Sequence, residues 1–149
     1  MSPRARGWTL ALATVGVVVA LDQITKAWAL ASIAPNERDN VFFGIDLVRV
    51  HNTGVAFGAL SGKGLLVLVA IIVALAALLA YFAANASVPW LWLPVGAVLG
   101  GALGNLADRA RIQGVTDFID PVLWPAFNVA DAAIVIGVLG VLYVAERPR

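Results

Sequence analysis

Two aspartates, Asp117 and Asp131, are the residues of this chain best suited to acid–base chemistry, and they flank the aromatic segment FIDPVLWPAFN at 118–128. Two carboxyl groups held close together in a poorly solvated site cannot both ionise easily, so one of them keeps a proton. One acid and one base are then available together, and they can activate water for attack on a peptide carbonyl without a metal or a covalent intermediate. The sequence therefore predicts a catalytic pair.

The pair lies in a polar stretch, Gly100 to Asp131, which starts at the end of one apolar run and finishes at the start of the next. Charge at a membrane boundary or within a span is costly, so it usually marks function or a paired structural contact. The other polar residues of this stretch include Asn105, Asp108, Arg109, Asp120 and Asn128. We therefore expect one site here.

Simpler structural explanations exist for several of these residues. Asp131 could be the third residue of a helix capped by Asn128, where the helix dipole favours an acidic side chain. Asp117 could be a plain loop carboxylate. Arg109 could orient a substrate carbonyl or an aspartate through its five fixed donors, or it could pair with Asp108 or extend to the membrane interface. The residues alone leave these alternatives open.

The remaining candidate residues precede this stretch or lie within it. Asn52 and Asn105 could offer donors and acceptors to a peptide backbone, or serve only as turn and cap residues. Asp22 and Lys26 are four residues apart, so on a helix they share a face, and we interpret them as a structural pair. His51 is interpreted as a surface residue.

The composition places the chain in a membrane. Of its 149 residues 61% are hydrophobic, and the mean hydropathy is +0.91, whereas soluble domains are roughly 45–50% apolar. The net charge of +1 without a Lys/Arg run argues against a nucleic-acid surface. No cysteine and one histidine leave no thiolate or histidine-built zinc site, and no cofactor is predicted.

Four apolar runs, at about 8–30, 65–84, 90–107 and 128–145, predict four transmembrane helices in a single membrane domain covering 1–149. The polar connector at 31–63 mixes β-branched and aromatic residues with glycines, which predicts short strands against the membrane surface. The first run could instead be a signal peptide, because Arg4 and Arg6 precede it. Asp22 and Lys26 argue against that, since they interrupt the expected cleavage region.

Alternating crossings bring all the polar groups to one face of the membrane, which supports a single site. Arginines near both ends of the chain indicate cytoplasmic termini, so the site would be extracytoplasmic. A transporter or channel component would distribute polar residues through the depth of the spans, which is not the pattern here. A scaffold or chaperone would tolerate Asp117→Asn.

The chain resembles the lipoprotein signal peptidase family, also called signal peptidase II. The matching stretches are LDQITK at 21–26, NTGVAF at 52–57, GGALGNLADR at 100–109, GVTDFID at 114–120 and WPAFNVAD at 124–131. They occur in the family's order and spacing, and with the four spans they cover essentially the whole chain.

The resemblance implies an intramembrane aspartic endopeptidase of the bacterial cytoplasmic membrane, with Asp117 and Asp131 as its catalytic dyad. Its substrates would be prolipoproteins carrying a diacylglyceryl group on a cysteine, cut just before that cysteine. Asn52, Asn105 and Arg109 would contact substrate, and Asp22, Lys26, Gly54, Gly101, Gly104 and Asn128 would support the site. The expected partners are these substrates and membrane lipid, not nucleic acid, and the chain would be a monomer.

The implied fold is an all-α membrane protein: four transmembrane helices and a small extracytoplasmic β-cradle from the 40–60 region, between the first two helices. The resemblance also suggests that the segment between Arg109 and Asp117 is a surface helix or loop able to close over substrate.

Overall fold

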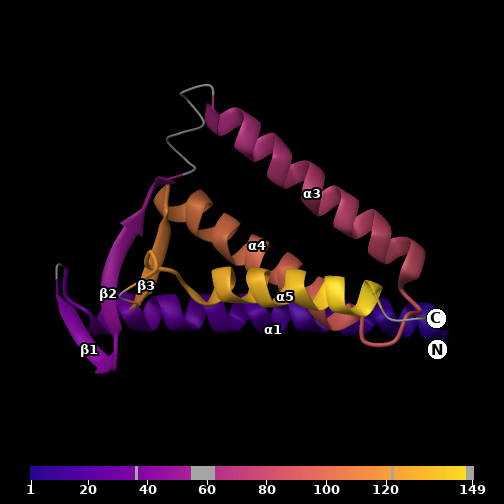
Figure 1. Cartoon of the computed structure of the whole chain (residues 1–149), viewed down its shortest axis with the longest axis horizontal. Coiled ribbons are helices and arrows are strands. Elements are labelled where there is room, and N and C mark those ends of the chain that lie inside the picture. The colour runs from indigo at the N-terminus through magenta and orange to yellow at the C-terminus, as the bar shows by residue number, and fades with distance from the viewer. Residues whose placement is uncertain (36, 55–62, 122, 147–149) are drawn as a thin grey trace.

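The computed structural model describes residues 1–35, 37–54, 63–121 and 123–146. Its elements, in chain order, are α1 (Pro3–Ser32), β1 (Arg38–Phe42), β2 (Ile45–Asn52), α3 (Lys63–Asn85), α4 (Trp92–Ile112), β3 (Val115–Pro121) and α5 (Val129–Ala145). The helices run along the long axis and the sheet covers one end, while both termini lie at the other end (Figure 1). Each predicted span coincides with a helix, within a few residues at each end.

Local signals set the helix ends. Ser2 caps α1, with its hydroxyl accepting from the Ala5 amide and Pro3 in the first turn, a position that suits proline because its missing N–H needs no partner. Helix α4 ends at Gln113, which adopts the left-handed conformation (φ 57°). Asn128 caps α5.

Helices α1, α4 and α5 pack along their lengths, and small residues let them approach. A Cβ on Gly96 would lie 2.6 Å from the Thr14 side chain on α1, and one on Gly137 would lie 2.6 Å from Val98 on α4. Helix α3 joins this bundle near its C-terminal end, where Phe82 is buried. Toward the sheet, α3 diverges from α4 (Figure 1).

The outer surfaces of the helices are apolar. Val135, Ile136, Leu139 and Leu142 of α5 are all exposed, which suits contact with lipid rather than water. By length and composition, α1 is the one helix in the described part of the chain that could cross a bilayer. The apolar helical stretches Val69–Asn85 and Val129–Ala145 are shorter. The number of membrane crossings therefore stays a prediction.

The sheet is antiparallel with strand order β1-β2-β3. Strands β1 and β2 form a hairpin in the connector after the first helix, where short strands were predicted. Strand β3 comes instead from between α4 and α5, and it pairs with β2 from Ile45–Pro121 to Asn52–Val115. A sheet confined to the segment between the first two helices was therefore wrong, as was a loop position for Asp117. Residues 55–57 of the NTGVAF stretch, and Gly58, lie outside the described residues.

The segment between Arg109 and Asp117 is neither a separate surface helix nor a separate loop. Helix α4 continues through Ile112, and Gln113 and Gly114 alone connect it to β3. Gly114 is tightly placed, because a Cβ there would lie 2.5 Å from the His51 ring on β2. The predicted separate surface helix or loop is thus a continuation of α4 followed by a two-residue link, and closure over substrate stays a prediction.

Candidate active site

Asp117 and Asp131 are joined through one residue, Asn128. The Asn128 side-chain amide donates to Asp117 Oδ1 at 2.7 Å, and its Oδ1 accepts from the Asp131 backbone amide at 3.0 Å. Asp117 lies in the middle of β3 and is 2% exposed, whereas Asp131 lies in the first turn of α5 and is half-buried. The structure thus brings the predicted pair together at the sheet end of the helices.

Asp131 has the structural role that the capping alternative predicted. Its Oδ2 accepts from the Asn128 backbone amide at 3.3 Å, which completes a reciprocal capping box. Its Oδ1 accepts from the Asn105 side-chain amide at 2.8 Å. Capping and a chemical role are compatible, because these bonds fix where the carboxylate points.

Asp117 is held from the hairpin side by Asn52. The Asn52 amide donates to Asp117 Oδ2 at 2.8 Å, and its own oxygen accepts from the Gly54 backbone amide at 2.9 Å, which sets the orientation of the amide. Burial raises the pKa of the Asp117 carboxyl above its ordinary value. The bonds from Asn52 and Asn128 oppose this rise, and the negative charge of Asp131 adds to it. The two carboxyl groups are therefore electrostatically coupled.

Lys26 is the buried cation of the cluster. Its ammonium lies 2.9 Å from Asp22 Oδ2 and 3.3 Å from Asp108 Oδ2, and it donates to Asn105 Oδ1 at 2.9 Å. The predicted Asp22–Lys26 pair is thus present on α1, and it extends to α4. Asp22 also reaches α5, because its Oδ1 accepts from the Ala130 backbone amide at 3.0 Å. One ion pair connects three helices.

Sequence reasoning placed Asp108 in the polar stretch without giving it a role, and it missed Gln23. Asp108 Oδ2 accepts from the Thr116 backbone amide at 3.1 Å, one residue before the Asp117 carboxylate. Gln23 donates to Asp108 Oδ1 at 3.2 Å and to Asp22 Oδ2 at 3.0 Å. Helical spacing could have indicated Gln23, because it is three residues from Lys26 and so shares a helix face with it.

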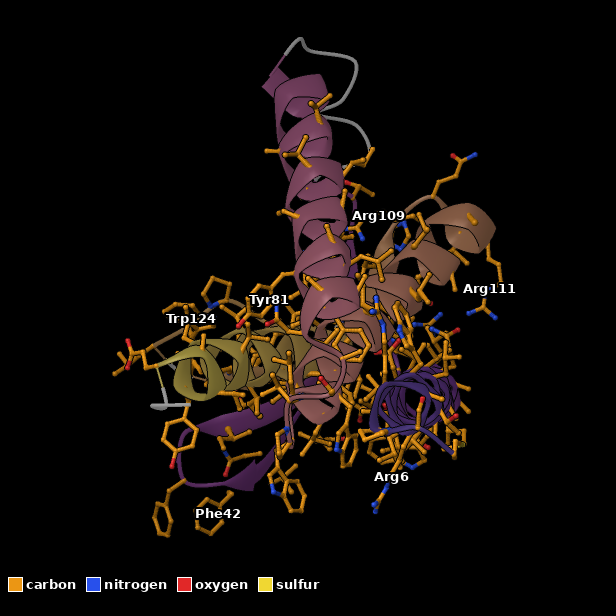
Figure 2. The ribbon with its side chains drawn as sticks, turned by 90° about the vertical axis from the view of Figure 1, so that its right-hand side faces the viewer. Arg6, Phe42, Tyr81, Arg109, Arg111 and Trp124 are labelled. Carbon is orange, nitrogen blue, oxygen red and sulfur yellow. The ribbon has the colours of Figure 1, made fainter. Side chains whose placement is uncertain are left out.

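In the described part of the chain, Arg109 does not form the ion pair with Asp108 that one sequence-based alternative predicted. Its guanidinium donates to the Asn105 backbone carbonyl at 3.3 Å, on its own helix. The ion-pair partners of Asp108 are instead Lys26 and the exposed Arg111, at 3.3 and 3.4 Å. Figure 2 shows Arg111 at the outer margin of α4, with Arg109 on the side toward α3 in that view. Among the residues that the structure describes, only the Asn105 carbonyl accepts a hydrogen bond from Arg109, and contact of Arg109 with substrate stays a prediction.

Two glycines of α4 make the network geometrically possible. A Cβ on Gly104 would lie 2.5 Å from Asp22 Oδ2, so a side chain there would displace the buried carboxylate. A Cβ on Gly101 would clash with the Ala130 backbone carbonyl of α5. Their absence of a side chain lets α4 approach both partners.

The groups that this site presents for acid–base chemistry are carboxyl groups. Among the residues that the structure describes, no group of three or more His, Asp or Glu side chains could hold a metal ion. Two surface cavities, of about 460 and 490 Å³, are lined by residues such as Arg6, Trp90 and Tyr143 at the end of the molecule that holds the termini. They lie away from Asp117, so neither is taken as the site of reaction.

Comparison with known proteins adds to this geometry. Residues 14–146 match the family model described as signal peptidase (SPase) II. The chain is 45% identical over 122 residues to a lipoprotein signal peptidase of Syntrophomonas wolfei, covering 81% of this chain and 82% of that protein. It is 46% identical over 131 residues to one of Moorella thermoacetica, covering 83% of each. A solved bacterial membrane enzyme superposes with a TM-score of 0.78 at 28% identity, over 93% of this chain and 94% of the other.

Proposed function

The chain belongs to the signal peptidase II family and is a membrane-bound protease, and on this premise we propose that Asp117 and Asp131 are its catalytic dyad. It removes signal peptides from prolipoproteins. In the proposed reaction the precursor carries a diacylglyceryl group on a cysteine, and the enzyme cuts the peptide bond just before that residue.

The observation that carries this proposal is the bridge through Asn128, which joins the side chain of Asp117 to the backbone and carboxylate of Asp131. The two carboxyls have different surroundings: Asp117 is buried in the sheet with a raised pKa, and Asp131 lies half-buried in the first turn of α5, where the helix dipole favours negative charge. From this asymmetry we infer that Asp117 carries the proton and that Asp131 acts as the base.

In the proposed reaction, protons move between the water molecule, the substrate and the two carboxyl groups. Asp131 accepts a proton from a water molecule while the oxygen of that water attacks the scissile carbonyl carbon. Asp117 gives its proton to the carbonyl oxygen. A neutral gem-diol results. As the C–N bond breaks, Asp131 passes its proton to the leaving nitrogen, and one diol hydroxyl returns a proton to Asp117. The products are a free carboxyl group and a free amine, and both aspartates regain their starting states.

The other predicted site residues take supporting roles. The exposed Asn52 can contact substrate while it holds Asp117. Asn105 is 6% exposed, and its amide is bonded to Lys26, Asn128 and Asp131. On this geometry Asn105 positions Asp131 rather than binding substrate. Arg109, whose guanidinium has five donors, is the better candidate to bind a substrate carbonyl.

The membrane arrangement in this proposal has all four helices crossing the bilayer, both termini in the cytoplasm, and the sheet end facing outward. The sheet lies at the end of the helices opposite the termini (Figure 1) and is hydrogen-bonded to the polar network, which supports a site on the membrane face opposite the termini. The lipid tails of the substrate stay in the bilayer, so the substrate reaches the site by lateral diffusion. The enzyme acts as a monomer without cofactor.

Conversion of a diacylglyceryl-modified precursor to its shorter form, followed on a gel, tests the dyad. Asp117→Asn and Asp131→Asn should each abolish cleavage while the protein stays folded and inserted. Asp120→Asn is a matched control, because Asp120 lies on the same strand but pairs with Arg38 at 2.8 Å; it should remain active. Full activity in either dyad variant would refute the proposed mechanism.

A further inference from the structure

Large apolar side chains are exposed at the end of the sheet where β3 finishes. Phe43 is 93% exposed and Leu123 is 94% exposed. Phe42 and Trp124 are 69% and 70% exposed, and Ile45 is 38% exposed. We call these five residues the hairpin-tip patch.

The strand register brings these residues together although they come from two distant segments. Phe42 pairs with Ile45 across the β1–β2 turn, and Ile45 pairs with Pro121 at the end of β3. The Trp124 amide donates to the Pro121 carbonyl at 3.2 Å, which keeps Trp124 close to the end of β3. The patch is therefore built by the fold and is not a scatter of single apolar residues.

The two faces of the sheet differ in polarity. Arg38 on β1 bridges Asp46 on β2 and Asp120 on β3, at 3.1 and 2.8 Å, which makes one face charged. On the opposite face Leu47 and Ile119, a cross-strand pair, pack against the apolar cluster at the end of α1. Ile45 is two residues from Leu47, so it shares this apolar face. The hairpin-tip patch is therefore a continuation of the apolar face of the sheet, past the part that packs against α1.

The patch lies outside the helix bundle at the level where the helices end. Figure 1 shows the turn between β1 and β2 projecting past α1. In Figure 2, which looks along the helices, Phe42 and Trp124 both lie at the outer margin of the molecule. At the end of membrane-crossing helices the surroundings are the headgroup region of the bilayer, where aromatic side chains are favoured.

We propose that the hairpin-tip patch inserts into the interface of the outward leaflet and anchors the sheet to the bilayer. The occupant of this surface is phospholipid, because the charged face of the same sheet points to water and the apolar face leads into the lipid region. Anchoring β3 at Pro121 fixes the depth of Asp117, four residues earlier on that strand. The proposal needs the helices to cross the membrane, but it does not need the chain to cleave anything.

Single-cysteine labelling tests the anchor directly, since the chain has no cysteine. Phe43→Cys and Leu123→Cys would carry an environment-sensitive fluorophore on the full chain in phosphatidylcholine–phosphatidylglycerol nanodiscs. Asn40→Cys is the matched control, because Asn40 lies on the same hairpin and bonds Asp46 on the charged face. Nitroxide-bearing lipid should quench the labels at 43 and 123 about twofold or more above the label at 40, and aqueous iodide should show the reverse order.

Equal quenching of all three labels by lipid and by iodide would overturn the anchor. Self-quenching or disulfide formation between chains through position 43 would also overturn it, and would assign the patch to contact between copies. The same measurement in an Asp117→Asn background needs no catalysis. Retained cleavage in Asp117→Asn with normal lipid quenching would therefore count against the proposed function alone.

Discussion

Lys26→Met is the perturbation that tests most directly whether the buried network holds the site. The substitution keeps much of the side-chain volume but removes an ammonium that is 2% exposed. The side chains of Asp22 and Asp108 are 0% and 6% exposed. In the variant, both carboxylates would lack their closest cation. Removing one partner of a buried ion pair typically costs about 3–5 kcal/mol, because the other charge stays buried and uncompensated.

The local hydrogen bonds place the expected loss near the lower end of that range. Asp22 keeps the Ala130 amide, and Asp108 keeps the Thr116 amide. Gln23 still donates to both carboxylates. We therefore expect a loss of about 3 kcal/mol in the free energy of unfolding, measured by denaturant titration in detergent micelles. Cleavage per folded molecule should also fall, because Asn105 loses a 2.9 Å donor.

A double variant and a control make the result interpretable. In Asp22→Asn/Lys26→Met the unpaired charge on α1 is also gone, so the double variant should lose about 1–3 kcal/mol less than the sum of the two single losses. Arg49→Met removes an exposed cation from β2 and should change stability by less than about 0.5 kcal/mol. If Lys26→Met costs no more than Arg49→Met and the double variant is additive, the network does not hold the site.

Three further predictions follow from the site. Arg109→Lys should reduce cleavage about 10-fold or more with little change in stability, because a point charge cannot reproduce the planar donor fork; unfolding with normal cleavage per folded molecule would make Arg109 structural. Gly104→Ala should destabilise the protein by displacing Asp22, whereas Gly16→Ala, which meets nothing within 4 Å, should be neutral or slightly stabilising in the same unfolding assay. The folded state binds the Asp117 proton more tightly than the unfolded state, so this stabilising contribution should be lost as pH rises through the folded pKa. The melting temperature of Asp117→Asn, compared with the parent across pH, should lack that decline.

The helices were predictable from the sequence because their signals are local. Long apolar runs predict α1, α3 and α5 directly, and Asn128 three residues before Asp131 predicts the cap that α5 has. The Asp22–Lys26 pair followed from helical spacing alone. The predicted alternation of membrane crossings placed the polar residues at one end of the helices. In the structure these residues are hydrogen-bonded to one another there.

Strand β3 was not predictable in the same way. Two aspartates and Pro121 in seven residues are typical of a loop, since Asp and Pro are depleted in strands. What makes this segment a strand is its partner β2, and the Asn52–Asp117 bond joins residues 65 apart in the chain. Pairing over that distance depends on how α1 and α4 place the two segments, and a pattern within one segment cannot reveal it.

The position of Asp117 in a buried strand also bears on the proposed proton, because burial there raises the pKa of its carboxyl. In the described part of the chain the buried charged side chains are Asp22, Asp108, Asp117 and Lys26, and Asp131 lies half-buried beside them. One buried ammonium cannot balance four carboxylates, and Arg111 contributes only from the exposed edge. Protonating one carboxyl lowers the charge imbalance, and the position with raised pKa is Asp117. The same ion pair that holds α1, α4 and α5 together therefore leaves the cluster short of positive charge, which favours the protonated Asp117 that the proposed mechanism uses as its acid.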